Sequence, residues 1–185
     1  HVAATRFGSI LKLYIDGTEA GSREDSQGAR GLVCGNFRIG HGRHGSPMEG
    51  YINDLRITKA LVYGNSRGNF TPSSTPLTVG EQDAGPVAIY LPFDSDTNDN
   101  SSYGHTVAAF GDAAISSAQA KFGGNSLAVD GSGDFLLIND VMNVFDFEQG
   151  DFTVECFIRP DSINTSSMTS SVATFIDLES GAGTS

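Results

Sequence analysis

The stretch Leu-Lys-Leu-Tyr-Ile-Asp-Gly, residues 11–17, shows a pattern that recurs along the chain. Its apolar side chains alternate with Lys12 and Tyr14, which is the period of a half-buried β-strand. Asp16-Gly17 then places two residues that tolerate positive φ after the strand, as a tight hairpin turn requires. These features predict a hairpin in which residues 18–20 return beside the first strand.

The rest of the chain consists of similar short apolar stretches, bounded by Gly, Asn, Asp or Ser and rich in β-branched and aromatic residues. Such stretches favour strands over helices. Further strands are predicted at residues 1–7, 37–39, 51–57, 87–93, 106–110, 126–130, 135–138, 152–159 and 172–178. Only short helical pieces are expected, around residues 59–62 and 141–145. Many short strands at this spacing indicate an all-β fold, an antiparallel jelly-roll β-sandwich.

Residues 152–159 indicate a strand in the interior of that sandwich. Phe152, Val154, Cys156 and Ile158 share one face, and Phe157 lies on the other, so the strand is expected to be packed on one side and partly covered on the other. Two further groups of residues are expected to be buried. Tyr51 and Tyr90 lie in predicted strands and are interpreted as core residues. Cys34 and Cys156 are interpreted as buried thiols, although two cysteines also allow a disulfide or reactive groups.

A joint rich in Pro, Ser, Thr and Gly at residues 71–86 divides the chain into parts of different charge. Residues 1–77 hold nine Lys and Arg against six Asp and Glu, a net +3, and residues 78–185 hold two against sixteen, a net −14, which together give −11. This negative charge argues against nucleic acid as a partner and favours cations. Since no apolar run approaches the roughly 20 residues of a membrane span, membrane insertion is not expected.

Two sets of motifs resemble the laminin G-like domains of the concanavalin A-like lectin/glucanase superfamily. His-Val-Ala-Ala-Thr-Arg (1–6), Leu-Lys-Leu-Tyr-Ile-Asp-Gly (11–17), Phe-Arg-Ile-Gly (37–40) and Gly-Tyr-Ile-Asn-Asp-Leu-Arg-Ile-Thr-Lys-Ala (50–60) resemble the C-terminal half of such a domain. Leu-Pro-Phe-Asp (91–94), Gly-His-Thr-Val (104–107), Lys-Phe-Gly-Gly-Asn-Ser-Leu (121–127), Asp-Gly-Ser-Gly-Asp-Phe-Leu (130–136) and Asp-Phe-Thr-Val-Glu-Cys-Phe-Ile-Arg-Pro (151–160) resemble the N-terminal half.

The two halves therefore occur in reversed order. The resemblance implies that residues 1–77 are the C-terminal half, residues 78–86 the linker and residues 87–185 the N-terminal half of one circularly permuted, concanavalin A-like domain. A tandem array sampled out of frame with its repeats would give this order. The halves are expected to close on each other, or to pair between chains as a strand-swapped homo-oligomer. Because the family pattern has additional strands between the two halves, an open groove or edge is also expected.

The resemblance implies a structural calcium ion. In the related β-glucanases an Asp in the strand before the C-terminus and backbone carbonyls near the first strand hold the ion, and Asp54 occupies the matching position. Carbonyls near Phe93 or Asp94 and near Gly131 are the expected companions. Calcium accepts irregular sets of oxygen ligands, so one carboxylate with carbonyls and water suffices. The alternative is a surface Asp54 that pairs with Arg56.

Two loops carry other candidate ligands. Residues 94–98 match the first ligands of an EF-hand loop, but Asp99 and His105 replace its glycine and its last glutamate, so this stretch is interpreted as a solvated acidic turn. In the Gly-rich stretch at residues 40–45, His41, Arg43 and His44 can hydrogen-bond sugar hydroxyls or bind metal. A plain connecting loop is the alternative, and the glycine spacing alone does not make a dinucleotide site because no helix follows.

Catalysis is not expected. The superfamily's glucanases use two Glu flanking an Asp, and Phe175 stands in place of the first Glu, so the two-carboxylate mechanism cannot run. The resemblance instead implies a carbohydrate-binding or adhesion module of a repetitive extracellular or virion-surface protein, with a glycan or cell-surface partner. The alternative is a structural spacer or decoration repeat without a ligand. The chain has no Trp and five Tyr, and an exposed aromatic pair beside a polar loop would favour the lectin.

Overall fold

The computed structural model describes residues 1–24, 34–41, 46–63, 68–80, 85–148, 150–161, 173–174 and 176–180. Its strands are β1 (Val2–Phe7), β2 (Ile10–Ile15), β3 (Thr18–Glu24), β4 (Cys34–Ile39), β5 (Ser46–Pro47), β6 (Glu49–Thr58), β7 (Val87–Leu91), β8 (Val107–Phe110), β9 (Ala114–Ser116), β10 (Ser126–Asp130), β11 (Phe135–Asn139), β12 (Phe152–Pro160), β13 (Ala173–Thr174) and β14 (Ile176–Ser180). The described residues contain no helix. The all-β prediction is confirmed.

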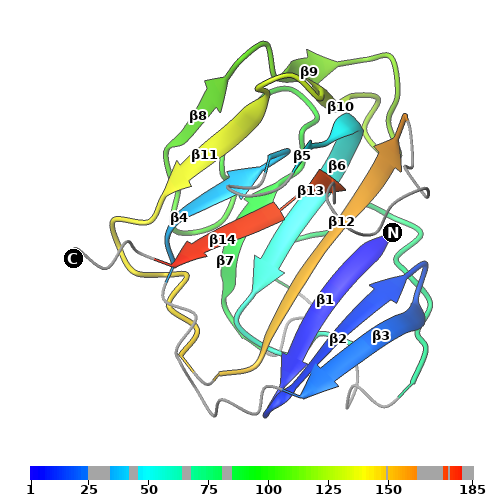
Figure 1. Ribbon diagram of the computed structural model, residues 1–185, viewed down its shortest axis with the longest axis vertical. Helices are drawn as coiled ribbons and strands as arrows, with labels where there is room; N and C mark the ends of the chain where they lie inside the picture. Colours follow the sequence, from blue (N-terminus) through cyan, green and yellow to red (C-terminus); the bar gives the residue numbers. More distant parts are fainter. Residues whose placement is uncertain are drawn as a thin grey trace.

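The strands form two antiparallel sheets of unequal size (Figure 1). The larger sheet has the order β3-β2-β1-β12-β6-β10-β9, with β7 also paired to β6. The smaller sheet has the order β14-β4-β11-β8, and β5 and β13 form a separate parallel pair. This arrangement is consistent with the concanavalin A-like sandwich that the sequence predicts. The predicted hairpin is also present, because β2 and β3 pair across Asp16 and Gly17, which both have positive φ.

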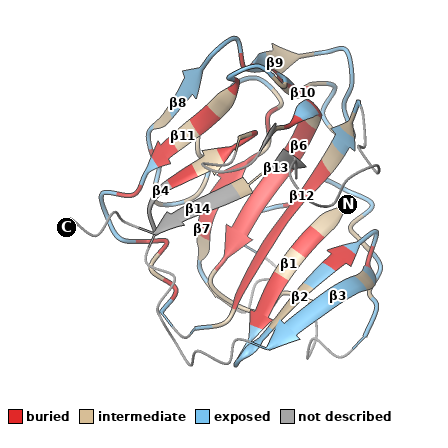
Figure 2. Ribbon diagram, in the orientation of Figure 1, coloured by how far each residue is buried: buried red, intermediate tan, exposed pale blue. Residues whose placement is uncertain are grey.

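The core lies between the two sheets. Its buried apolar side chains come mainly from the central strands. Figure 2 shows that β6 and β12 are buried along much of their length. The largest fully buried members include Phe37, Ile39, Ile52, Leu55, Ile57, Leu127 and Leu136. Burying each such side chain contributes about 1.5–3 kcal/mol, so the facing strands hold the sheets together. The predicted face of β12 is confirmed, since Phe152, Val154 and Cys156 belong to this core and Ile158 packs against it.

Strands from the two sides of the 71–86 joint alternate in the larger sheet. β6 lies between β12 and β10 and also pairs with β7, and all three of these strands follow the joint. β1 pairs with β12 on its other side. The two parts of the chain thus close on each other within one molecule. The permuted order, the domain boundaries and the strand-swapped oligomer stay predictions.

A β-bulge in β6 changes which side chains lie on the outer face of the larger sheet, the face that points away from the core. Arg56 pairs with Glu155, and Asn53 pairs with Phe157, so β6 advances three residues while β12 advances two. Asp54, the residue inside the bulge, has a φ of 58°. Because a bulge breaks the alternation of side chains, Asn53 and Asp54 both point away from the core.

A second, smaller apolar layer covers part of this outer face. Leu77, Tyr90 and Phe157 form a buried cluster there, with Val87 and Phe122 packed against it. The cluster confirms that β12 is covered on both sides and that Tyr90 is buried. It also brings residues 68–80 and 117–125, which are outside the strands, onto the sheet.

The two predicted helical pieces are wrong. At residues 59–62, the Thr153 hydroxyl accepts the Val62 N–H at 3.0 Å and donates to the Ala60 carbonyl at 2.9 Å, so these backbone groups bond to β12. At residues 141–145, the Asp140 carboxylate accepts the N–H groups of Val144 and Phe145 at 2.8 and 2.6 Å. Side-chain bonds of this kind replace the backbone bonds of a helix.

The larger sheet extends beyond the smaller one at β1, β2 and β3 (Figure 1). An apolar groove of about 510 Å³ lies there, lined by residues that include Val2, Ala4, Leu11, Leu13 and Val154. Leu13 is 42% exposed and Ile15 is 53% exposed. The expected open groove is therefore present. Cys156, also in the lining, is a buried free thiol whose pKa is raised by burial, and the side chain of Cys34 lies outside the described residues.

Candidate functional site

A cleft of about 460 Å³ lies on the outer face of the larger sheet, beside the smaller apolar layer. Its floor is formed by β6 and β12, and its walls by residues 72–74 and 119–121. Clefts of this size, roughly 300–1,000 Å³, are typical of small-molecule sites. The cleft is therefore the first place to look for a ligand.

Strand register places the floor residues side by side. Tyr51 pairs with Arg159, and Asn53 pairs with Phe157, so the four side chains share one face. The Arg159 guanidinium carbon lies 5.9 Å from the centre of the Tyr51 ring, close enough for a cation–π contact. Tyr51 is only partly buried and lines the cleft, so its interpretation as a core residue was wrong. The reason is that this face of β6 is covered around Asn53 but open at Tyr51.

Asn53 fixes one wall of the cleft. Its side-chain amide donates to the carbonyls of Pro92 and Asn125 at 3.1 and 3.0 Å. Its side-chain oxygen accepts the N–H groups of Lys121 and Phe122 at 3.2 and 2.9 Å. Asn53 is 4% exposed, and these four bonds use its two donors and both acceptor positions. A single buried side chain thus holds the loop that carries Lys121.

Lys121 brings a positive charge to this wall. Its ammonium nitrogen lies 5.8 Å from the Phe122 ring centre and 6.0 Å from that of Phe157. Rings at this distance attract a cation through the negative face of their π system. The charge is therefore held over the aromatic floor of the cleft.

Asp54 holds the segment that forms the other wall. Its carboxylate, 1% exposed, accepts the Leu77 N–H at 2.6 Å and the Tyr90 hydroxyl at 2.9 Å. Arg56 donates to the Thr78 carbonyl at 2.7 Å and is itself paired with Glu155. Burial raises the pKa of Asp54 to about 6, although the bonds from Leu77 and Tyr90 act in the opposite direction. The alternative that placed Asp54 on the surface is wrong, because the residue is buried.

Among the predicted calcium ligands, Gly131 lies away from Asp54. Gly131 lies beside Glu49, where β6 begins, and at about 3.3 Å per residue this is roughly 16 Å from Asp54. The side chain of Asp94 packs against Gly123, and its carbonyl accepts a hydrogen bond from the Asn125 amide. Asp54 and Gly131 therefore do not share one ion. Calcium binding as such stays a prediction.

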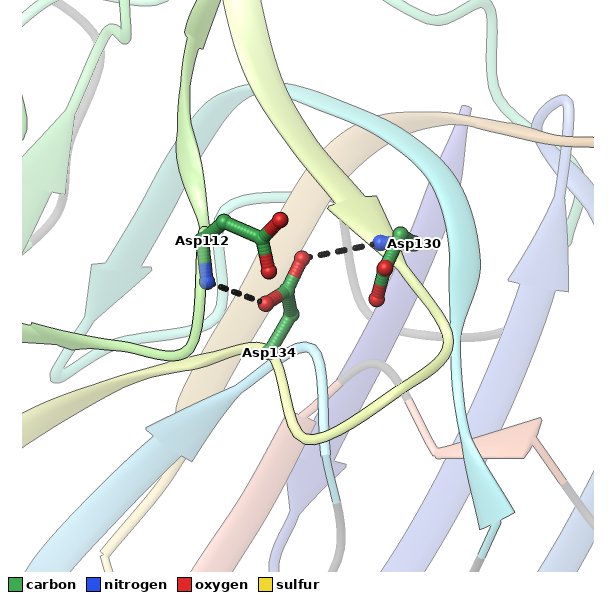
Figure 3. Close-up of side chains that lie close together, drawn as sticks. All are labelled: Asp112, Asp130 and Asp134. Carbon is green, nitrogen blue, oxygen red and sulfur yellow. Dashed lines mark hydrogen bonds between the residues drawn. The ribbon is translucent and has the colours of Figure 1, made fainter.

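Within the described residues, the group of three or more possible metal-binding side chains is Asp112, Asp130 and Asp134 (Figure 3). One ligand atom from each lies within 4.8 Å of the others. The buried Asp134 carboxylate accepts the N–H groups of Asp112 at 2.7 Å and Asp130 at 3.0 Å. Through these two bonds, Asp134 joins the turns that follow β8 and β10, which gives its carboxylate a structural role.

Asp99 shows that the acidic turn is more than a solvated loop. Its carboxylate accepts N–H groups from Tyr90, Ser101 and His105 at 3.0, 2.8 and 2.9 Å. It also contacts the His105 ring at 2.7 Å, and both side chains are 0% exposed. Burial raises the pKa of Asp99, but the hydrogen bonds outweigh this effect and keep the pKa below its usual value. Asp96 is exposed, as the sequence predicts.

His41 lies at an aromatic surface of the smaller sheet. Its ring is 6.0 Å from that of Phe135, which stacks on Phe110 at 4.6 Å, and Arg38 lies 5.0 Å from Phe135. Phe110 is 42% exposed and Phe135 is partly exposed, so this aromatic pair reaches the surface. Arg43 and His44 lie outside the described residues. This surface is a second candidate for a ligand site. Comparing a variant of the cleft with a variant of this surface distinguishes the two sites.

The sequence did not predict the residues that line the walls of the cleft, which include Ser73, Ser74, Gln119 and Lys121. One signal was available. Lys121 and Arg159 are the two basic residues in the strongly acidic stretch 78–185, and both line the cleft. Their proximity depends on the pairing of β12 with β6 and on the bonds of Asn53, which spacing along the chain does not reveal.

Comparison with known proteins supports the family resemblance in the first part of the chain. Residues 1–62, which include β1 to β6, match a laminin G family model described as the concanavalin A-like lectin/glucanases superfamily. The laminin G-like identification is thus confirmed for this part, and the all-β antiparallel fold agrees with it. Neither the curated proteins nor the solved structures gave a match to the chain. Within the described residues, no helix is long and apolar enough to cross a membrane.

Proposed function

We propose that this protein is a non-catalytic carbohydrate-binding module and that the cleft over β6 and β12 holds the glycan. The observation that carries the proposal is the mixed lining of the cleft. Tyr51 and Phe157 supply aromatic surface on the floor, and Ser73, Ser74 and Gln119 supply hydrogen-bonding groups on the walls. The superfamily match of residues 1–62 is compatible with such a module.

This lining suits the two kinds of surface that a sugar ring presents. The ring has an apolar face of C–H groups and a polar edge of hydroxyl groups. An aromatic side chain offers a flat apolar surface for the first. Hydroxyl and amide side chains both donate and accept hydrogen bonds, as the second requires. Tyr51 is the best placed aromatic residue, because it is partly exposed at the cleft while Phe157 is buried.

Binding without hydrolysis is favoured by the acidic groups in the cleft. Among the described lining residues, Asp16 is the one carboxylate. Glycosidases act with a pair of carboxyl groups on either side of the bond that breaks. The proposed module therefore recognises a glycan and does not cleave it. Laminin G-like domains are typically extracellular, which supports a location on the outside of a cell or a virion.

A glycan array tests the proposal, using the wild-type chain, Tyr51→Ala and Phe110→Ala. We expect the wild type to bind a defined glycan class, Tyr51→Ala to lose at least about tenfold in affinity, and Phe110→Ala to bind normally. Melting temperatures of all three proteins confirm folding. If Phe110→Ala alone lost glycan affinity, the glycan site would lie at the aromatic pair of the smaller sheet and not in the cleft. No binding by folded wild type would favour the structural spacer.

A further inference from the structure

We propose that the cleft selects glycans with an acidic sugar, whose carboxylate binds between Lys121 and Arg159. This inference rests on the proposed function, because it names the class of glycan that the same cleft takes. It goes beyond that function by assigning a charge to the ligand and a role to two residues.

The distribution of charge is the first support. Residues 78–185 carry sixteen acidic residues and two basic ones, and both basic residues line the same cleft. A surface so rich in negative charge repels anions in general. Two cations at one cleft create a local exception, at which an anionic group is attracted while the rest of the surface repels it.

The geometry of the two cations is the second support. Lys121 lies over Phe157, and Arg159 lies over Tyr51. Phe157 and Arg159 are two residues apart on one face of β12, which is about 7 Å. A carboxylate placed between the two cations thus has one on each side. The guanidinium offers a planar pair of donors that matches a carboxylate, and the ammonium adds a compact charge.

The neighbouring acids set a limit on the charge of the ligand. Arg159 contacts Asp161 at 3.1 Å, but both side chains are well exposed, at 58% and 41%, so the pair is weak and a ligand carboxylate can replace Asp161. Asp16 also lines the cleft. Because these two acids repel further negative charge, the cleft suits one isolated carboxylate, as in a uronic or sialic acid, better than a densely sulfated chain.

The test compares acidic glycans with their methyl esters, which keep the sugar and remove the charge. An array carrying such matched pairs is followed by titration of the acidic glycan that binds best. We expect the methyl ester to bind at least about tenfold more weakly, and Lys121→Gln and Arg159→Gln each to lose about tenfold for the acid only. Lys12→Gln, at a basic residue of β2 that does not line the cleft, is the matched control and should bind as the wild type does.

The outcomes separate this inference from the proposed function. Binding of acid and ester with equal affinity, or full affinity in both cleft variants, overturns the acidic specificity and leaves a neutral-glycan module. Stronger binding of sulfated polymers than of carboxylated sugars also overturns it. Absence of any glycan binding overturns both proposals. An affinity for the acid that falls with added salt, lost in both cleft variants and retained in Lys12→Gln, supports it.

Discussion

The carboxylate of Asp54 accepts the backbone N–H of Leu77 in a buried hydrogen bond of 2.6 Å, which ties the segment before β7 to the centre of the larger sheet. Leu77 lies three residues after the segment 72–74, which forms one wall of the cleft, so this bond anchors the chain next to that wall. The family resemblance assigned Asp54 to a calcium ion. In the folded chain, this side chain joins two layers of the protein, and its binding of calcium stays a prediction.

Asp54→Asn should change how stability depends on pH. Because burial raises the pKa of Asp54 to about 6, the folded state retains a proton between about pH 4 and 6 that the unfolded state has lost. The contribution of this group to stability is therefore largest near pH 4 and falls as pH rises to 6. Thermal melts between pH 4 and 7 should show the advantage of the wild type over the variant shrinking with rising pH. A difference that stays constant would contradict the assignment.

Calcium is tested by melting the wild type and Asp54→Asn in excess calcium and in chelator. An ion that binds only the folded state raises the melting temperature. Since Leu77 and Tyr90 already bond both carboxylate oxygens, we expect any effect of calcium to be equal in the two proteins. A calcium effect present in the wild type and absent from the variant would instead restore Asp54 as a ligand.

Asn53→Ala should lower the free energy of unfolding by about 3 kcal/mol or more, because it leaves buried donors and acceptors of the Lys121 loop without partners. Asn98→Ala, at an exposed position of another loop, should change it by less than about 0.5 kcal/mol. Urea unfolding measures both. The role of Asn53 would be rejected if the two variants were equally stable.

Leu13→Glu should weaken self-association with little loss of stability. Leu13 is 42% exposed in the groove, so a charged side chain reaches water there while the apolar surface for a partner is interrupted. Sedimentation over a range of concentrations should show a larger species in the wild type than in the variant. If the wild type remained monomeric at every concentration, the prediction of a homo-oligomer would be contradicted.

The strands were predictable because local sequence determines them. The alternation in residues 10–15 and the Asp16-Gly17 turn define a hairpin without help from the rest of the chain. The cleft was not predictable in this way. Alternation shows that Tyr51 and Ile52 face opposite sides of β6, but which side is open depends on loops elsewhere in the chain. Pairing across β6 and β12, and the four bonds of Asn53, bring those loops to the sheet.

Two acidic residues were difficult to interpret from the sequence for one physical reason. Asp54 and Asp99 lie in polar stretches, where the sequence suggests solvent or a cation. In the structure each carboxylate accepts backbone N–H groups. Buried backbone donors need partners, and an acidic side chain supplies them without any periodic signature.

Strands from before and after the 71–86 joint alternate in the larger sheet, and this also affects how the chain folds during translation. Val2 pairs with Cys156, and Glu155 pairs with Arg56, so the first strands have neighbours that are translated at least about 100 residues later. At roughly 5–20 residues per second, a ribosome needs several seconds to supply them. Such high contact order also slows folding after release. During this interval the apolar residues of β1 and β2 remain uncovered, and a nascent chain is then most open to chaperones or to the strands of a neighbouring copy.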